Sequence, residues 1–191
     1  VLNKMGNQAG VINYCPPYHT VRYSAVKNPF VFAISNDKKL KNKKFSFRTY
    51  QFVRNFAKSV YLTITGEYKK REENFQQFIG KHLVLSKRYK SLKELQKTPP
   101  KFDAYITGSD QVWNPDMHNG SFDKAYFLDF GESSIKKLSY AASLRQTYSE
   151  DEKKELASLC RNIDAVSSRE TNGALDEVLG RPYEICIDPT L

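Results

Sequence analysis

Three clusters of polar residues stand at the ends of short apolar runs, where ligand chemistry is to be expected. The first is the stretch Gly108-Ser109-Asp110-Gln111-Val112-Trp113-Asn114-Pro115-Asp116. Glycine lets the backbone approach a ligand closely, Asp110 and Gln111 carry groups that hydrogen-bond hydroxyls, and the only Trp offers a flat face to a sugar ring. The alternative is an ordinary turn, capped by Ser109 or Asp110, with Trp113 in the core.

The second cluster carries an arginine and the third a carboxylate, and both clusters also stand at the ends of predicted strands. Ser167-Ser168-Arg169-Glu170 stands at a predicted strand-to-helix junction. Backbone N–H groups at a helix N-terminus, together with a guanidinium, favour a phosphate or carboxylate, although an Arg169–Glu170 surface pair is the alternative. The third cluster is Ile187-Asp188-Pro189-Thr190-Leu191. Its Asp188 carboxylate either lines a ligand-binding crevice or belongs to a simple turn of the chain.

Proton transfer has a candidate in His118, which follows Trp113 by five residues and stands close to Asp116. Histidine is the usual proton-transfer side chain near neutral pH. His19 and His82 have no such neighbours, and the spacing of His, Cys and acidic residues predicts no metal site. The chain lacks a phosphate-binding Gly-rich loop and a G-x-S-x-G motif, which argues against nucleotide and serine hydrolysis.

The elements that must position these clusters alternate along the second half of the chain. The pattern predicts strands at 102–107, 138–142, 164–168 and 183–187, with helices at 149–163 and 169–180 between the later ones. Short connections of this kind imply right-handed crossovers and a parallel sheet. Ligands of such sheets bind outside the carboxyl ends of the strands, so the three clusters should meet there.

The first half of the chain is less regular. Residues 1–5 read as the last turn of a helix that stops at Gly6, and residues 9–14 favour a strand. Apolar spacing predicts a helix over 45–65 and a second over 68–79 with Gly80 as its stop. Ser91 and Glu94 form the N-terminal signature of a short helix. The stretch 18–44 is loop-like, with an apolar run at 30–34.

Composition restricts the class of protein. The 191 residues are 40% hydrophobic and 13% aromatic, which excludes a disordered chain. No apolar run reaches the ~20 residues of a membrane span, and the first residues do not resemble a signal peptide. Three widely spaced cysteines predict free thiols in a reducing cytoplasm.

The net charge of +9 is unevenly distributed. Residues 1–100 carry 20 Lys or Arg against 5 Asp or Glu, whereas residues 101–191 carry 10 against 16. A basic half can bind nucleic acid, anionic membrane or a phosphorylated ligand, or it can form solvated helix faces. No nucleic-acid-binding signature is present, which argues against nucleic acid.

Read in order, five stretches resemble the polysaccharide pyruvyl transferase family. They are Phe102–Pro115, Ala125–Phe130, Lys137–Ser143, Asp164–Glu170 with Gly173, and Asp188–Leu191. The resemblance covers about residues 100–191, is weak over 2–17 and is nearly absent over 18–99. Leu144-Arg145 departs from the small or Gly residue that the family often has there.

The resemblance implies an α/β fold, with a Rossmann-like parallel sheet flanked by helices as one half of a GT-B-like two-domain architecture. It makes the chain an incomplete N-terminal domain that is inactive alone, lacking the family's first strand and its second domain. Residues 18–99 are then a variable, basic, largely helical region, and residues 100–191 the motif-bearing βαβ core.

The implied function is transfer of the enolpyruvyl group of phosphoenolpyruvate to sugar hydroxyls of a bacterial cell-surface polysaccharide or its lipid-linked precursor, giving a pyruvate ketal. No metal or cofactor is implied. We expect a cytoplasmic enzyme, with peripheral association at the inner face of the membrane. The predicted catalytic residues are Asp110, Asp116 and His118. The predicted substrate-binding residues are Gly108, Ser109, Gln111, Trp113, Asn114, Arg169 and Glu170.

Two other functions fit the same sequence. One is a GT-B-type glycosyltransferase that uses a nucleotide-sugar donor. The other is a non-enzymatic basic module that binds nucleic acid or anionic lipid through residues 1–100.

Overall fold

The structure, a computed structural model, describes residues 2–19, 45–118, 120–169 and 174–189. The predicted apolar run at 30–34 and the predicted site residue Glu170 lie outside these ranges. The chain forms two compact units, Val1–Arg88 and Tyr89–Leu191, and each is described by itself.

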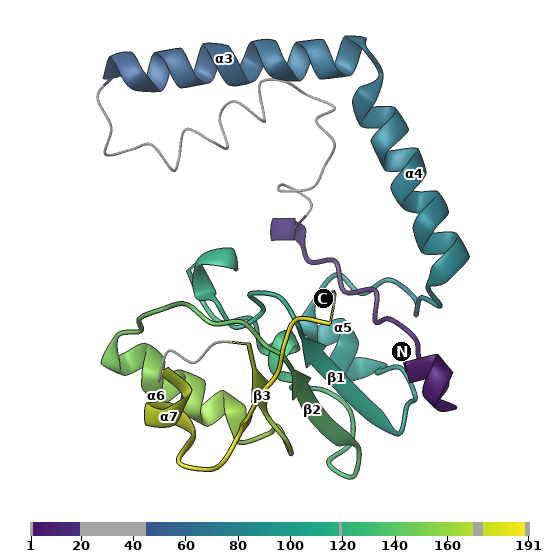
Figure 1. The fold of residues 1–191 in the computed structure, drawn as a ribbon, viewed down its shortest axis with the longest axis vertical. Coiled ribbons are helices and arrows are strands. Elements are labelled where there is room, and N and C mark those ends of the chain that lie inside the picture. The colour runs from purple at the N-terminus through teal and green to yellow at the C-terminus, as the bar shows by residue number, and fades with distance from the viewer. Residues whose placement is uncertain (1, 20–44, 119, 170–173, 190–191) are drawn as a thin grey trace. The chain divides into compact units, whose positions relative to one another are not determined.

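The first unit is mainly helical. A short 3-10 helix, η1, spans Leu2–Met5, and two longer helices, α3 over Phe45–Ile64 and α4 over Glu67–His82, appear in Figure 1. Gly66 separates α3 from α4 with φ of 70°, a left-handed conformation that interrupts a helix. The predicted stop at Gly80 was wrong, because an exposed glycine weakens a helix by only about 1 kcal/mol and does not end it.

The predicted strand at 9–14 is reduced to two isolated bridge residues, Val11 and Tyr14, of which Val11 pairs in parallel with Leu85. The Val11 N–H donates to Val84 O at 2.7 Å, and the Ser86 N–H donates to Val11 O at 2.9 Å. Ser86 Oγ also accepts from the Asn13 N–H at 3.0 Å. This bridge ties the N-terminal segment to the residues that follow α4.

The second unit contains a small parallel sheet. Strand β1, Ala104–Gly108, pairs with β2, Lys136–Tyr140, and β3, Ser167–Ser168, pairs with β4, Glu184–Ile185. Two parallel bridges, Leu138 with Ala165 and Ala142 with Ser168, connect β2 to β3. These pairings and bridges place the strands in the order β1-β2-β3-β4, of which Figure 1 labels the first three. The prediction of an α/β fold with a parallel sheet is confirmed.

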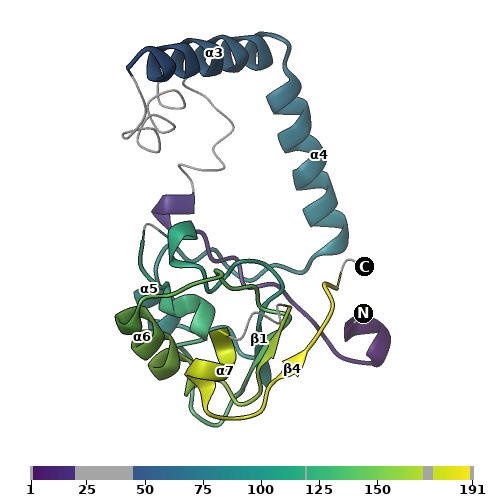
Figure 2. The ribbon, with the colours of Figure 1, turned by 60° about the vertical axis from the view of Figure 1, so that its left-hand side comes forward.

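Short helices precede and connect the strands, with α5 before β1 and the others between successive strands. They are α5 over Leu92–Lys97, η3 over Pro115–Met117, η4 over Lys124–Phe127, α6 over Glu150–Cys160 and α7 over Ala174–Leu179. Helix α6 begins at a capping box in which Ser149 accepts from the Glu152 N–H while the Glu152 carboxylate accepts from the Ser149 N–H. Helices α6 and α7 contact each other and lie side by side in both views (Figures 1 and 2).

The core of the second unit lies against one face of the sheet. In β1, Tyr105 and Thr107 are buried, whereas the alternate residues are exposed. Leu156 and Ile163, in and just after α6, are fully buried. Trp113, in the loop after β1, and Ala142, in the loop after β2, are also 0% exposed, so both loops contribute to this core.

Candidate functional site

The carboxyl end of β1 lies against the backbone of β2. Gly108 has φ of 125°, and a Cβ at this position would lie 2.2 Å from Tyr140 O. The next residue, Ser109, has φ of 34° and donates its N–H to Tyr140 O at 3.2 Å. Only glycine fits position 108, because the close approach of β2 leaves no room for a side chain.

Backbone hydrogen bonds join the ends of the next strands to this turn. The Ser143 N–H donates to Asp110 O at 3.1 Å, and the Arg169 N–H donates to Ala142 O at 3.2 Å. The residues that follow β1, β2 and β3 therefore form one continuous edge.

Arg169 connects the three polar clusters at this edge. Its Nη1 donates to Ser109 O at 3.1 Å and forms an ion pair with Asp188 Oδ2. The Arg169 side chain is 32% exposed and that of Asp188 is 20% exposed. The structure thus brings together Ser109, Arg169 and Asp188, each of which follows a different strand. A guanidinium held in this way is suited to an anionic ligand that reaches the edge of the sheet.

Asp110 and Gln111 have exposed side chains in the turn after β1. Asp110 Oδ1 accepts from the Gln111 N–H at 2.8 Å, and Gln111 Oε1 accepts from Asn114 Nδ2 at 3.1 Å. Asn114 is buried, and its Oδ1 accepts from the Asp116 N–H at 3.0 Å, which caps η3. Asp110 and Gln111 can therefore meet a substrate, whereas the Asn114 amide shapes the loop.

The structure places Trp113 in the core. Its side chain is 0% exposed, its Nε1–H donates to Tyr126 O at 3.0 Å, and its ring stacks on Phe127 with centroids 5.2 Å apart. The prediction that Trp113 offers a face to a sugar ring is corrected here. A fully enclosed indole contributes its large apolar surface to packing, as in the alternative interpretation of this stretch.

His118 also lies inside the loop. It is 6% exposed, its Nε2 lies 3.1 Å from Val112 O, and its ring stacks on Tyr126 with centroids 4.9 Å apart. These contacts fix the loop that follows β1.

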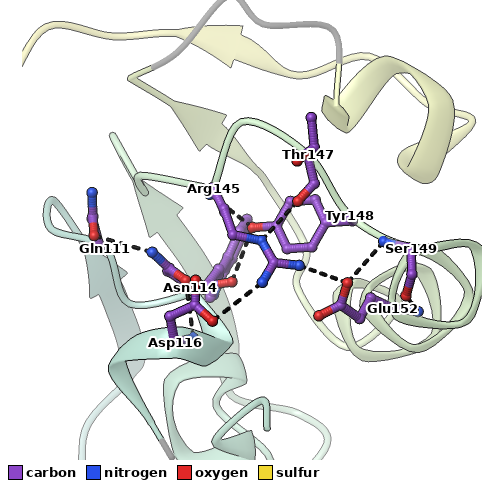
Figure 3. A network of polar contacts seen from close by, with 9 residues as sticks. Gln111, Asn114, Asp116, Arg145, Thr147, Tyr148, Ser149 and Glu152 are labelled. Carbon is purple, nitrogen blue, oxygen red and sulfur yellow. Dashed lines mark hydrogen bonds and ion pairs between the residues drawn. The ribbon is translucent and has the colours of Figure 1, made fainter. Parts of the chain in front are cut away.

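Arg145 joins this loop to α6 (Figure 3). Its Nη1 lies 3.3 Å from Asp116 Oδ1, its Nη2 donates to Glu152 Oε2 at 2.6 Å, and its Nε donates to Thr147 O at 2.7 Å. The guanidinium also lies over the ring of Tyr148, 4.9 Å from the centroid. The exposed Asp116 carboxylate is therefore oriented by an arginine from the loop after β2.

The electrostatics of this cluster follow from its hydrogen bonds. The pKa of Glu152 is lowered, first by the backbone N–H of Ser149 and then by Arg145. The pKa of Arg145 is raised, mainly by its hydrogen bond to Glu152. Sequence reasoning did not place Arg145 in the site. The signals that it could have used were the departure from the family at this position and the capping box, which marks Glu152.

The described parts of the chain contain no group of three or more His, Cys, Asp or Glu residues arranged to hold a metal ion. None of the helices in those parts is long and apolar enough to cross a membrane.

Comparison with known proteins identifies a family. A family model described as polysaccharide pyruvyl transferase matches residues 1–191. It includes residues 18–99, where the resemblance is hardest to see in the sequence. No curated protein and no solved structure matches the chain.

Proposed function

Because the chain belongs to the polysaccharide pyruvyl transferase family, we propose that it transfers the enolpyruvyl group of phosphoenolpyruvate to sugar hydroxyls as a pyruvate ketal. The observation that carries this proposal is the meeting of Arg169, Ser109 and Asp188 at the carboxyl edge of the sheet. Parallel α/β sheets bind ligands at that edge, and a guanidinium matches the geometry of a phosphate or carboxylate.

The bond changes define what such a site must supply. One sugar hydroxyl oxygen adds to C2 of phosphoenolpyruvate, and C3 receives a proton and becomes a methyl group. A second hydroxyl oxygen then bonds to C2, the C2–O bond to phosphate breaks, and inorganic phosphate leaves. The reaction needs a base for the hydroxyls, an acid for C3 and cationic donors for the two anionic groups. These bond changes balance without a metal or a redox cofactor.

Arg169 is the proposed ligand of the anionic donor. About a third of its side chain is exposed, so a phosphate or carboxylate can reach the guanidinium. Asp188 offsets part of the positive charge, and a bound anion would therefore compete with this carboxylate for the arginine.

Asp110 and Gln111 are the proposed contacts of the acceptor. Their side chains are exposed in the turn whose backbone Arg169 contacts through Ser109. A carboxylate at this position can accept the proton of a sugar hydroxyl, so Asp110 is the proposed base. The other predicted residues support the loop in this proposal: Gly108, Trp113, Asn114, Asp116 and His118. Glu170 stays a predicted substrate contact.

The domain arrangement, the acceptor and the location of the reaction belong to the same proposal. We infer a GT-B-like arrangement in which this sheet forms one side of the cleft, with a saccharide or lipid-linked saccharide of a bacterial cell surface as the acceptor. The reaction would take place on the cytoplasmic side of the membrane.

The test is calorimetric titration of the protein with phosphoenolpyruvate and, separately, with UDP-glucose. Binding of phosphoenolpyruvate should weaken by about ten- to a hundredfold in Arg169→Gln, because a hydrogen bond to a charged group is lost. Arg161→Gln, which changes an exposed arginine in the second unit, is the matched control and should bind normally.

If the protein binds UDP-glucose but does not bind phosphoenolpyruvate, the result would favour the nucleotide-sugar glycosyltransferase instead. Unchanged affinity in a folded Arg169→Gln protein would remove Arg169 from the site. In turnover assays with candidate acceptor sugars, the proposal expects one inorganic phosphate for each ketal formed.

A further inference from the structure

Helix α3 carries a stripe of exposed apolar side chains. Tyr50, Val53, Tyr61 and Ile64 are each between 58% and 79% exposed. Together with Ala57 they follow one another at steps of three and four residues, which places them on one face of the helix. Single exposed apolar residues are ordinary, but a continuous stripe indicates a binding surface.

A second stripe of the same helix is less exposed. Phe52 and Phe56 are half-buried, and their rings stack with centroids 6.4 Å apart. The exposed stripe is therefore a separate surface of α3, which we call the Tyr50–Ile64 stripe after its first and last members.

The charge around the Tyr50–Ile64 stripe has one sign. Helix α3 contains no Asp or Glu, and its three charged residues, Arg48, Arg54 and Lys58, are all basic. Arg54 and Lys58 are exposed, and Arg54 follows Tyr50 by four residues and precedes Tyr61 by seven, so it lies on the same face. An apolar stripe that carries only cations complements an anionic surface.

We propose that α3 lies on an anionic lipid surface, with the Tyr50–Ile64 stripe in the headgroup region. Tyrosine rings are favoured at membrane interfaces because they are apolar with a polar tip. Arginine and lysine bury their aliphatic stems there while their charges reach lipid phosphates. The charges within α3 suit a helix that lies in the plane of the interface.

The same residues argue against a second copy of the chain as the occupant. Pairing two α3 helices through this stripe would bring Arg54 and Lys58 of each copy close to those of the other. Like charges of this kind destabilise an interface. The inference goes beyond the proposed transferase activity and does not depend on it.

The test is co-sedimentation of the protein with vesicles of phosphatidylcholine alone and with vesicles that also contain phosphatidylglycerol. We expect binding to the anionic vesicles only, and weaker binding at high salt. In Arg54→Gln/Lys58→Gln the partition coefficient should fall about thirtyfold, since each basic residue near an anionic surface contributes separately.

Matched controls separate the stripe from overall charge and hydrophobicity. Lys101→Gln/Lys136→Gln removes the same charge from exposed positions in the second unit, and Val84→Ser removes an exposed apolar side chain outside α3. Both should bind anionic vesicles as the unchanged protein does. Tyr61→Ser/Ile64→Ser should bind less.

Three outcomes would overturn the proposal. The Lys101→Gln/Lys136→Gln control could lose as much vesicle binding as Arg54→Gln/Lys58→Gln, or both α3 variants could bind anionic vesicles as well as the unchanged protein. The protein could also bind RNA and not bind vesicles. A dimer that Tyr61→Ser/Ile64→Ser dissociates, without vesicle binding, would assign the stripe to a second copy. If circular dichroism shows that this variant has lost helix, the Arg54→Gln/Lys58→Gln variant decides, because it alters exposed polar side chains only.

Discussion

Arg145 and Glu152 form a 2.6 Å ion pair that joins the loop after β2 to the first turn of α6. The same carboxylate accepts the Ser149 N–H at 2.8 Å and so also completes the helix cap. One side chain thus supports both the start of α6 and the arginine that orients Asp116.

Replacing Glu152 should make stability depend on pH in a defined way. Its pKa lies below the ordinary value of 4.5, so its contribution is full above that pH and is lost as pH falls through the lowered pKa. Glu152→Gln should lower the free energy of unfolding by about 1 kcal/mol at neutral pH. Urea denaturation should show this difference shrinking below about pH 4.5.

The control for Glu152 is Glu155→Gln, which changes an exposed acidic residue of the same helix. The free energy of unfolding of this variant should differ little from that of the unchanged protein at every pH. A Glu152→Gln difference that persists unchanged under acid conditions would contradict the assigned role of the carboxylate.

Alanine should have opposite effects at two glycines. Gly108→Ala places a Cβ against Tyr140 O at a positive φ, and we expect a loss of about 3 kcal/mol in stability. Gly80 lies within α4 with open space around it, so Gly80→Ala should raise stability by about 0.5–1 kcal/mol. Denaturation midpoints measure the stability change of each variant. A Gly108→Ala protein as stable as the unchanged one would be inconsistent with the close approach of β1 and β2.

Arg181 should stabilise the C-terminal end of α6. Its guanidinium donates to the carbonyl oxygens of Cys160, Ile163 and Asp164, which counters the partial negative charge at a helix end. We expect Arg181→Ala to lower stability by about 1–2 kcal/mol. Lys101→Ala, which removes an exposed cation outside α6, is the control and should change stability by less than about 0.5 kcal/mol.

The three cysteines should differ in reactivity. Burial raises the pKa of the Cys160 thiol to about 12, so little thiolate forms near neutral pH. Cys15 and Cys186 are half-buried. Reaction with a disulfide reagent in the folded protein should therefore modify two thiols before the third. Cys160→Ala should remove the slow phase only, and loss of a fast phase would show that the assignment is wrong.

Features that depend on local sequence could be predicted. The N-terminal cap of α6 is formed by Ser149 and Glu152, which are three residues apart in the sequence. Ser91 and Glu94 form the cap of α5 at the same spacing. The meeting of Ser109, Arg169 and Asp188 was also predictable, because carboxyl ends of parallel strands share an edge.

Features that depend on tertiary packing could not be predicted. Arg145 contacts Asp116 across 29 residues, and no local pattern records that pair. Nor does sequence spacing show whether an aromatic residue after a strand faces solvent or core. The stacking partner of Trp113, Phe127, is supplied by η4, and its position is set by the fold.

The enclosure of Trp113 has a practical consequence for spectroscopy. It is the only tryptophan of the chain and lies in the second unit, whereas α3 and α4, the two longest helices among the described residues, lie in the first. Its fluorescence therefore reports on one unit, while far-ultraviolet ellipticity is dominated by the other. A single unmodified protein thus contains two optical probes, and comparing their transitions measures whether the two units unfold together or separately.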